Sequence, residues 1–209
     1  MQVQYNITRF GLIRHAQTRW NLEKRIQGQS DSPLTADGVR QATRWGKLLK
    51  PFGWDRIIAS DTGRAHETAK LINGSLNMSL TTDGRLREQD WGQWAGKTIV
   101  QLKTEIPQEL KDQEKAGWAF CPPGGEDRKT VQKRSQKALL EAAAQWPGSN
   151  ILVVTHEGVI KSLIYHLCDR KFLATEPAIL KPYQVHRLAH DQNGLRVEEL
   201  NALSIEAGC

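Results

Sequence analysis

Short apolar runs alternate with amphipathic stretches along most of the chain. The runs have the length and composition of buried strands, which are expected over 9–13, 54–59 and 150–155. The amphipathic stretches predict helices over 35–49 (with Thr35 as N-cap), 62–72, 127–146 and 158–167. The second of these helices is expected to end at Asn73-Gly74.

Two regions depart from this pattern. Residues 86–96 are rich in Trp and Gly without a clean period, and 98–114 predicts short helices interrupted by Pro107. Near the end, apolar alternation on both sides of Asp191-Gln192-Asn193-Gly194 predicts a β-hairpin within 182–200.

Strands interleaved with helices indicate an α/β fold whose central sheet is mostly parallel, with an antiparallel hairpin or strand at one edge. At 209 residues the chain has the length of one domain, which we expect to span 1–209. The chain is long enough to fold around a hydrophobic core without disulfides or metal.

Basic and histidine side chains follow the expected strands. The first strand ends at Arg14-His15, the second leads through residues 60–63 to Arg64, and the third ends at His156. Because parallel sheets bind ligands beyond the carboxyl ends of their strands, these groups are expected to meet on one rim.

Two arginines and two histidines suit phosphoryl transfer. Guanidinium groups bind phosphate oxygens bidentately, and a neutral imidazole can attack phosphorus and carry the phosphoryl group. A second, protonated histidine can stabilise the charge on the transferred group. The departing oxygen needs a proton, and Glu88 in the irregular stretch is the leading candidate to supply it.

Each of these residues alone has a plainer interpretation. A histidine at a strand end is more often structural than catalytic, and Trp91 and Trp94 more often pack beneath a loop than bind substrate. A metal site is disfavoured, because His15, His66 and His156 lie outside any H-x-x-x-H helix or acidic cluster. We therefore expect no metal.

Charge and cysteine content constrain the partners and the compartment. The net charge of +6 fits an anionic partner, but Lys and Arg are dispersed and form no nucleic-acid motif. No run is long enough for a membrane span and no secretory signal is visible. Cys121, Cys168 and Cys209 are widely separated, which disfavours a disulfide framework. A cytoplasmic protein that binds neither nucleic acid nor membrane, as a monomer or homodimer, is expected.

Five motifs in order carry a resemblance to a known family. LIRHAQTRWNLEKRIQGQSDSPLTADGVRQA, SDTGRAHETA, LREQDWGQWAGKT, PPGGED and VVTHEGVI resemble those of the histidine phosphatase superfamily, also called the phosphoglycerate mutase-like family. The match covers about the first 165 residues, and the terminal hairpin fits as well. Taken together, the five motifs are highly specific.

The resemblance implies roles for particular residues. His15 would be the nucleophile that becomes phosphohistidine, Arg14, Arg64 and His156 the phosphate pocket, and Glu88 the proton donor. Asn21 would add a further donor to the pocket, and Gln27 and Gly28 match a substrate-binding loop at its mouth. It further implies a three-layer α/β/α sandwich and neither a metal nor an organic cofactor.

The chain departs from the family pattern at two positions. Ala16 follows the nucleophilic histidine, where the family usually has glycine, so a glycine-only backbone angle would be strained there. Glu157 stands where a glycine commonly follows the second histidine. Because a carboxylate aimed at phosphate would repel it, the Glu157 side chain is expected to point elsewhere, or to meet a polar or cationic part of the substrate.

Three functions remain open at this point. The first is a metal-independent phosphomonoesterase that acts on a small phosphorylated metabolite such as a phosphosugar, a phosphoglycerate-type compound, a nucleotide or α-ribazole phosphate. The second is a phosphoglycerate mutase, which the short chain disfavours because mutases of this family are usually longer. The third is a non-catalytic protein that binds phosphate or nucleic acid.

Overall fold

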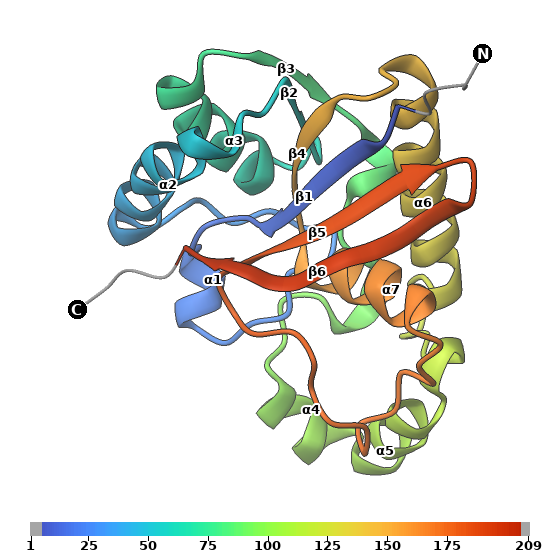
Figure 1. The fold of residues 1–209 in the computed structure, drawn as a ribbon. Coiled ribbons are helices and arrows are strands. Elements are labelled where there is room, and N and C mark those ends of the chain that lie inside the picture. Colours follow the sequence, from blue (N-terminus) through green and yellow to red (C-terminus); the bar gives the residue numbers. More distant parts are fainter. Residues whose placement is uncertain (1–5, 206–209) are drawn as a thin grey trace.

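A single six-stranded sheet organises the computed structural model, which describes residues 6–205 (Figure 1). The strand order is β3-β2-β4-β1-β5-β6. The strands are β1 (Thr8–Arg14), β2 (Arg56–Ala59), β3 (Ser79–Thr82), β4 (Asn150–Thr155), β5 (Gln184–Asp191) and β6 (Gly194–Ser204). The first four are parallel, and β5 and β6 form the expected antiparallel hairpin at one edge.

Helices cover both faces of the sheet, which confirms the three-layer α/β/α prediction (Figure 1). Side chains alternate between the faces along β4: Ile151 and Val153 pack with α6 and α7, whereas Leu152 and Val154 pack with α2 and α3. These helices are α2 (Ala36–Leu49), α3 (Gly63–Leu76), α6 (Arg128–Gln145) and α7 (Glu157–Leu167).

The register of the parallel strands brings their carboxyl ends to one edge. Arg14 at the end of β1 lies opposite Thr155 at the end of β4, and Ala59 at the end of β2 lies opposite Val154. His15 and His156 are the next residues in their respective segments. The sheet therefore places both histidines side by side, as the strand pattern predicts.

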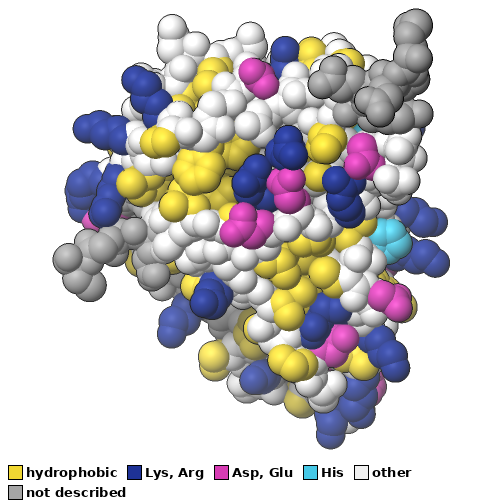
Figure 2. Space-filling view, in the orientation of Figure 1, with side chains coloured by type: hydrophobic (Ala, Val, Ile, Leu, Met, Phe, Trp, Pro, Cys, Tyr) yellow, Lys and Arg dark blue, Asp and Glu magenta, His cyan; other side chains and the backbone are white. Residues whose placement is uncertain are grey.

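A smaller lobe lies beyond this edge. It contains α4 (Ile99–Glu105), α5 (Pro107–Lys115) and short 3₁₀ turns, packed around Trp94, Leu102, Leu110 and Phe120. Pro107 begins α5, which fits the predicted interruption. Figure 2 shows Lys and Arg scattered over the drawn face among Asp and Glu.

Three elements differ from the sequence prediction. α3 does not end at Asn73-Gly74 but continues to Leu76. The Asn73 side chain donates to the carbonyl oxygen of Met78 and accepts from its N–H, just beyond the helix end. The strand β3 escapes prediction because it is short and mostly exposed, without apolar alternation. A further helix, α1 (Arg19–Leu22), lies in a stretch for which no element was predicted, and it begins with a capping box from Thr18.

None of the helices within residues 6–205 combines the length and apolar character needed to cross a bilayer. Cys121 and Cys168 are free thiols, and Cys209 lies outside the described residues.

Candidate active site

A cavity of about 450 Å³ opens at the carboxyl edge of the sheet. Most of the residues singled out in the sequence line it: Arg14, His15, Asn21, Gln27, Gly28, Arg64 and Glu88. His156 lies directly behind this wall, with a fully buried ring 5.3 Å from that of His15. The structure thus brings together all eight predicted site residues, contributed by segments far apart in the chain.

The imidazole of His15 is held in one orientation at the cavity wall. Its Nδ1 lies 2.8 Å from the carbonyl oxygen of Ala16, to which it can only donate, so Nε2 carries the lone pair of the neutral ring. Burial lowers the pKa of His15 well below its ordinary value, and the charges of Arg14 and Arg64 lower it further. His15 is therefore an unprotonated base whose Nε2 is available to an electrophile in the cavity.

Arg64, at the start of α3, is fixed by contacts along its whole guanidinium group. Nη1 donates to Ser30 O and Nη2 to Gly28 O, both at 2.7 Å, and Asp31 accepts a longer bond at 3.2 Å. The bond from Nε to His15 Nε2 is the longest, at 3.3 Å. Because that bond is weak, an incoming anion can replace it while the others hold the guanidinium in place.

His156 is neutral in the free protein. Its Nδ1 accepts from Arg64 Nη2 at 3.2 Å, and Nε2 donates to the hydroxyls of Ser60 (2.9 Å) and Thr62 (3.1 Å). Burial, followed by the charge of Arg64, lowers the pKa of His156 well below its ordinary value. The expectation of a protonated second histidine concerns the transfer step, when an anion occupies the cage, and it stays a prediction.

The Glu88 carboxyl group lies across the cavity at the amino end of α7. Oε1 accepts from Gln89 N at 2.8 Å and Oε2 from Gly158 N at 3.2 Å. Burial raises the pKa of Glu88, although these two N–H groups partly oppose the shift. A raised pKa keeps a larger fraction of the carboxyl group protonated near neutral pH, as a proton donor requires.

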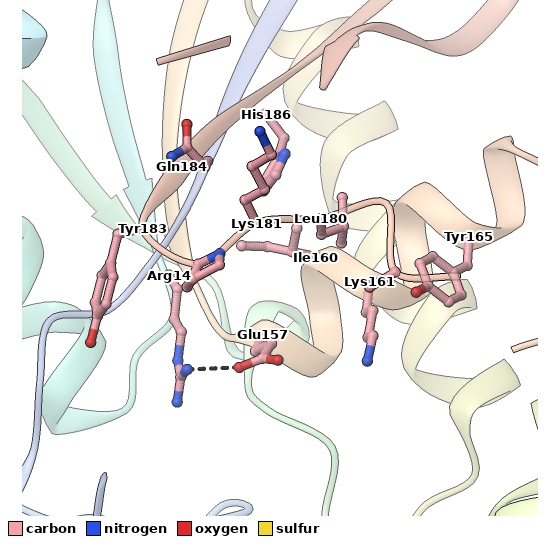
Figure 3. Close-up of a pocket in the computed structure, with 12 residues that line it drawn as sticks. Arg14, Glu157, Ile160, Lys161, Tyr165, Leu180, Lys181, Tyr183, Gln184 and His186 are labelled. Carbon is pink, nitrogen blue, oxygen red and sulfur yellow. Dashed lines mark hydrogen bonds and ion pairs between the residues drawn. The ribbon is translucent and has the colours of Figure 1, made fainter. Parts of the chain in front are cut away.

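Glu157 forms an ion pair with Arg14, which separates the active-site cavity from a second one (Figure 3). Arg14 Nη1 lies 2.7 Å from Glu157 Oε2. The second cavity, of about 250 Å³, lies between α7 and residues 178–186 and shares Arg14, Glu157 and Lys161 with the first. In the free protein Glu157 therefore occupies an Arg14 donor expected to bind phosphate.

The remaining predicted residues have clear local roles. Asn21 Oδ1 accepts from the backbone and hydroxyl groups of Thr18, which caps α1. Gly28 has a φ of 54° and presents its carbonyl to Arg64, and an added β-carbon would lie 3.0 Å from Trp91 N. Gln27 is buried, and its Oε1 has no hydrogen-bond partner among the described residues.

Ala16, which follows His15, is free of backbone strain. Its φ is not among the positive values found in residues 6–205, so no glycine-only conformation is needed. Its methyl group is fully buried, and its N–H donates to Thr68 Oγ1 at 3.0 Å.

Several cavity residues were not identified from the sequence. Arg128 and Lys161 line the wall, and Phe172 lies beside them. Lys161 stands on the helix that follows His156, four positions beyond Glu157, and this helical spacing is a signal that places both on one face. Arg128 and Phe172 belong to segments that meet only in the folded protein, so no sequence signal links them.

No group of three or more His, Cys, Asp or Glu side chains within the described residues is arranged to hold a metal ion.

Comparisons with known proteins agree on one family. The sequence profile of the histidine phosphatase superfamily (branch 1) matches residues 10–203. A relative from Salmonella paratyphi B, named probable phosphoglycerate mutase GpmB, is 39% identical over 182 residues, which are 87% of this chain and 85% of the relative.

Solved structures show the same similarity. Bacillus stearothermophilus YhfR superposes with a TM-score of 0.86 at 33% identity, over 95% of this chain and all of the other. A mycobacterial glucosyl-3-phosphoglycerate phosphatase superposes with a TM-score of 0.80 at 31% identity, over 93% of this chain and 99% of the other.

Proposed function

The chain belongs to branch 1 of the histidine phosphatase superfamily, and we propose that it is a metal-independent phosphomonoesterase that acts through a phosphohistidine intermediate. The single observation that carries this proposal is the state of His15. Its neutral ring is anchored through Nδ1, and Nε2 is directed at a cationic cavity that also contains a buried carboxyl group.

In the first step His15 Nε2 attacks the phosphorus atom of the bound phosphomonoester. The P–N bond forms as the bond to the leaving oxygen breaks, and the protonated Glu88 carboxyl group transfers its proton to that oxygen. Arg64 exchanges its weak bond to His15 for a phosphate oxygen, and Arg14 exchanges Glu157 for another. As negative charge enters the cage, His156 can take up a proton and become a donor.

In the second step water replaces the leaving group. The Glu88 carboxylate accepts a proton from this water, the oxygen attacks phosphorus, and the P–N bond breaks. Inorganic phosphate leaves, and both His15 and Glu88 return to their starting states.

A phosphoglycerate mutase is the second candidate, since the Salmonella relative carries that name. The same 182 aligned residues make up 87% of this chain and 85% of the relative, so the two have nearly equal length. Chain length therefore does not separate the two activities, contrary to the argument from the sequence. The mycobacterial neighbour named as a phosphatase supports hydrolysis.

The experiment is a phosphate-release assay in the presence of EDTA on wild type, His15→Ala and Glu88→Gln. We expect wild-type turnover, loss of activity in His15→Ala, and acid-labile, base-stable phosphate labelling only when His15 is present. Glu88→Gln should lose far more activity on alkyl phosphates than on p-nitrophenyl phosphate, whose leaving group needs little protonation. Equal activity of wild type and His15→Ala would refute the mechanism.

The same reaction mixtures separate hydrolase from mutase. Supplied with 3-phosphoglycerate, a phosphatase releases phosphate and glycerate, whereas a mutase accumulates 2-phosphoglycerate and depends on a bisphosphorylated primer. Dominant 2-phosphoglycerate formation would replace the proposed hydrolase with the mutase.

A further inference from the structure

Five cationic side chains line the active-site cavity: Arg14, Arg25, Arg64, Arg128 and Lys161. Three of them have carboxylate partners, in the pairs Arg14–Glu157, Arg25–Glu23 and Arg64–Asp31. Arg128 and Lys161 form no ion pair with any residue in the described part of the chain. A phosphate cage built from Arg14, Arg64 and the two histidines leaves these two cations unexplained.

Arg128, the first residue of α6, is held rigidly between two aromatic rings. Its guanidinium carbon lies 4.1 Å from the ring centres of both Phe120 and Phe172. Nη1 donates to the carbonyl oxygens of Gly117 (3.0 Å) and Phe172 (3.1 Å). Nε and Nη2 donate to no atom of residues 6–205, so the edge of the guanidinium that binds an oxyanion bidentately is free.

This arrangement is costly for a residue with only a structural role. Burial lowers the pKa of Arg128 to about 10, so the side chain is desolvated yet still charged at neutral pH. Arg128 is half-buried, and a cation withdrawn from water in this way is normally paired with an anion. Phe172 also adopts a φ of 62°, which is uncommon for a large side chain, while it supplies one ring and one carbonyl group to Arg128.

Lys161 approaches the same aromatic group from α7. Its Nζ lies 5.9 Å from the ring centre of Phe172 and 5.8 Å from that of Tyr165. The ammonium group and the free edge of Arg128 thus flank Phe172 at the same cavity. Both stand on helices other than the elements that carry Arg64 and His15, which hold the phosphoryl group in the proposed function.

We propose that Arg128 and Lys161 form a second anion subsite, which selects phosphomonoesters whose leaving group carries a carboxylate or a second phosphate. This inference rests on the proposed function, because it places the transferred phosphoryl group at His15. The rigid fork of Arg128 supplies two parallel hydrogen bonds, and Lys161 adds a mobile point charge.

The test compares substrates that differ only in the second anionic group. Glycerol 3-phosphate and 3-phosphoglycerate share a carbon skeleton, and fructose 6-phosphate and fructose 1,6-bisphosphate differ by one phosphate. We expect wild type to prefer at least one charged member by about 10-fold or more in kcat/KM. Arg128→Gln should lower kcat/KM on that substrate by about 10- to 100-fold, mainly by raising KM. On the matched substrate without the second anionic group, kcat/KM should fall by at most about 3-fold. Lys161→Met should show a smaller loss of the same kind.

Matched variants separate this role from general ones. Arg128→Lys keeps the charge and should recover part of the preference. Arg44→Gln removes the same charge from an exposed position on α2 and should change neither substrate. Equal losses on charged and neutral substrates in Arg128→Gln, or no wild-type preference in either pair, would overturn the subsite while leaving the phosphatase proposal intact.

A binding measurement tests the subsite even if the protein is not a phosphatase. If wild type releases phosphate from none of these compounds, calorimetric binding of 3-phosphoglycerate and glycerol 3-phosphate to wild type and Arg128→Gln still tests the subsite. The subsite is supported if wild type binds 3-phosphoglycerate more tightly than glycerol 3-phosphate and Arg128→Gln does not. Equal affinity of both proteins for both ligands overturns it.

Discussion

Replacing Gly158 with alanine should disable the proton donor without unfolding the protein. A β-carbon at Gly158 would lie 2.3 Å from Glu88 Oε1 and 3.1 Å from its Cδ. Non-bonded heavy atoms need about 3.5 Å, so the carboxyl group must retreat by about 1 Å. It would also lose or lengthen its bonds to the N–H groups of Gln89 and Gly158.

The magnitude follows from the geometry of proton transfer. A misplacement of about 1 Å can cost about 100-fold in rate, within the range that a general acid contributes. Stability should change little, because the atom displaced is the free end of a side chain. Alanine also favours a helix by about 1 kcal/mol over glycine.

The assay is kcat for Gly158→Ala on glycerol 3-phosphate and on p-nitrophenyl phosphate, together with urea unfolding. We expect a loss of about 100-fold on the alkyl substrate and less than about 10-fold on the nitrophenyl one. Gly74→Ala is the matched control, since nothing lies within 4 Å of its added β-carbon on α3. Adding Glu88→Gln to Gly158→Ala should cause no further loss, because both changes remove the same step. Wild-type kcat on glycerol 3-phosphate, or equal loss on both substrates, would refute this reasoning.

Three further predictions concern packing, pH and the cavity boundary. Gly11→Ala should lower the free energy of unfolding, measured by urea titration, by about 2–4 kcal/mol. The added β-carbon would lie 2.2 Å from the buried indole of Trp54, which is itself hydrogen-bonded. Unchanged stability would contradict that packing. Burial lowers the pKa of His186 from 6.5 to about 4, so between these values the unfolded chain binds more protons and stability falls as pH falls. His186→Gln should lose less stability than wild type over this window in thermal melts, and parallel curves would exclude the effect. Glu157→Gln breaks the ion pair with Arg14 and should tighten inhibition by inorganic phosphate by about 2- to 5-fold. Weaker inhibition, or the same relative activity on different substrates as wild type, would show that Glu157 does not compete with the ligand for Arg14.

The strand-end residues were predictable because a physical rule connects sequence to position. An apolar run that stops at a charged pair marks the carboxyl end of a buried parallel strand, and His15 and His156 both follow such runs. The predicted cap at Thr35 is equally local, since its side chain accepts from the backbone N–H of Gly38, three residues ahead.

The rest depends on contacts that no local pattern encodes. Arg128 becomes a free guanidinium fork only because Phe120 and Phe172 converge on it from separate segments. The neutral state of His156 depends on burial against Arg64, which periodicity does not report. Asn73-Gly74 looks like a helix end, but the Asn73 side chain bonds backbone groups beyond the helix instead.

The pairing of β1 with β4 has a consequence for the lifetime of the protein. His15 and His156 lie 141 residues apart in the chain, so pairing of the parallel strands that precede them must close a long connection. The phosphate cage is therefore absent from the unfolded chain, and an anion that binds it stabilises the folded state by mass action. At 100 times its Kd this amounts to about 2.7 kcal/mol. Substrate supply would then set both turnover and resistance to proteolysis, so that the protein persists longest where its ligand is abundant.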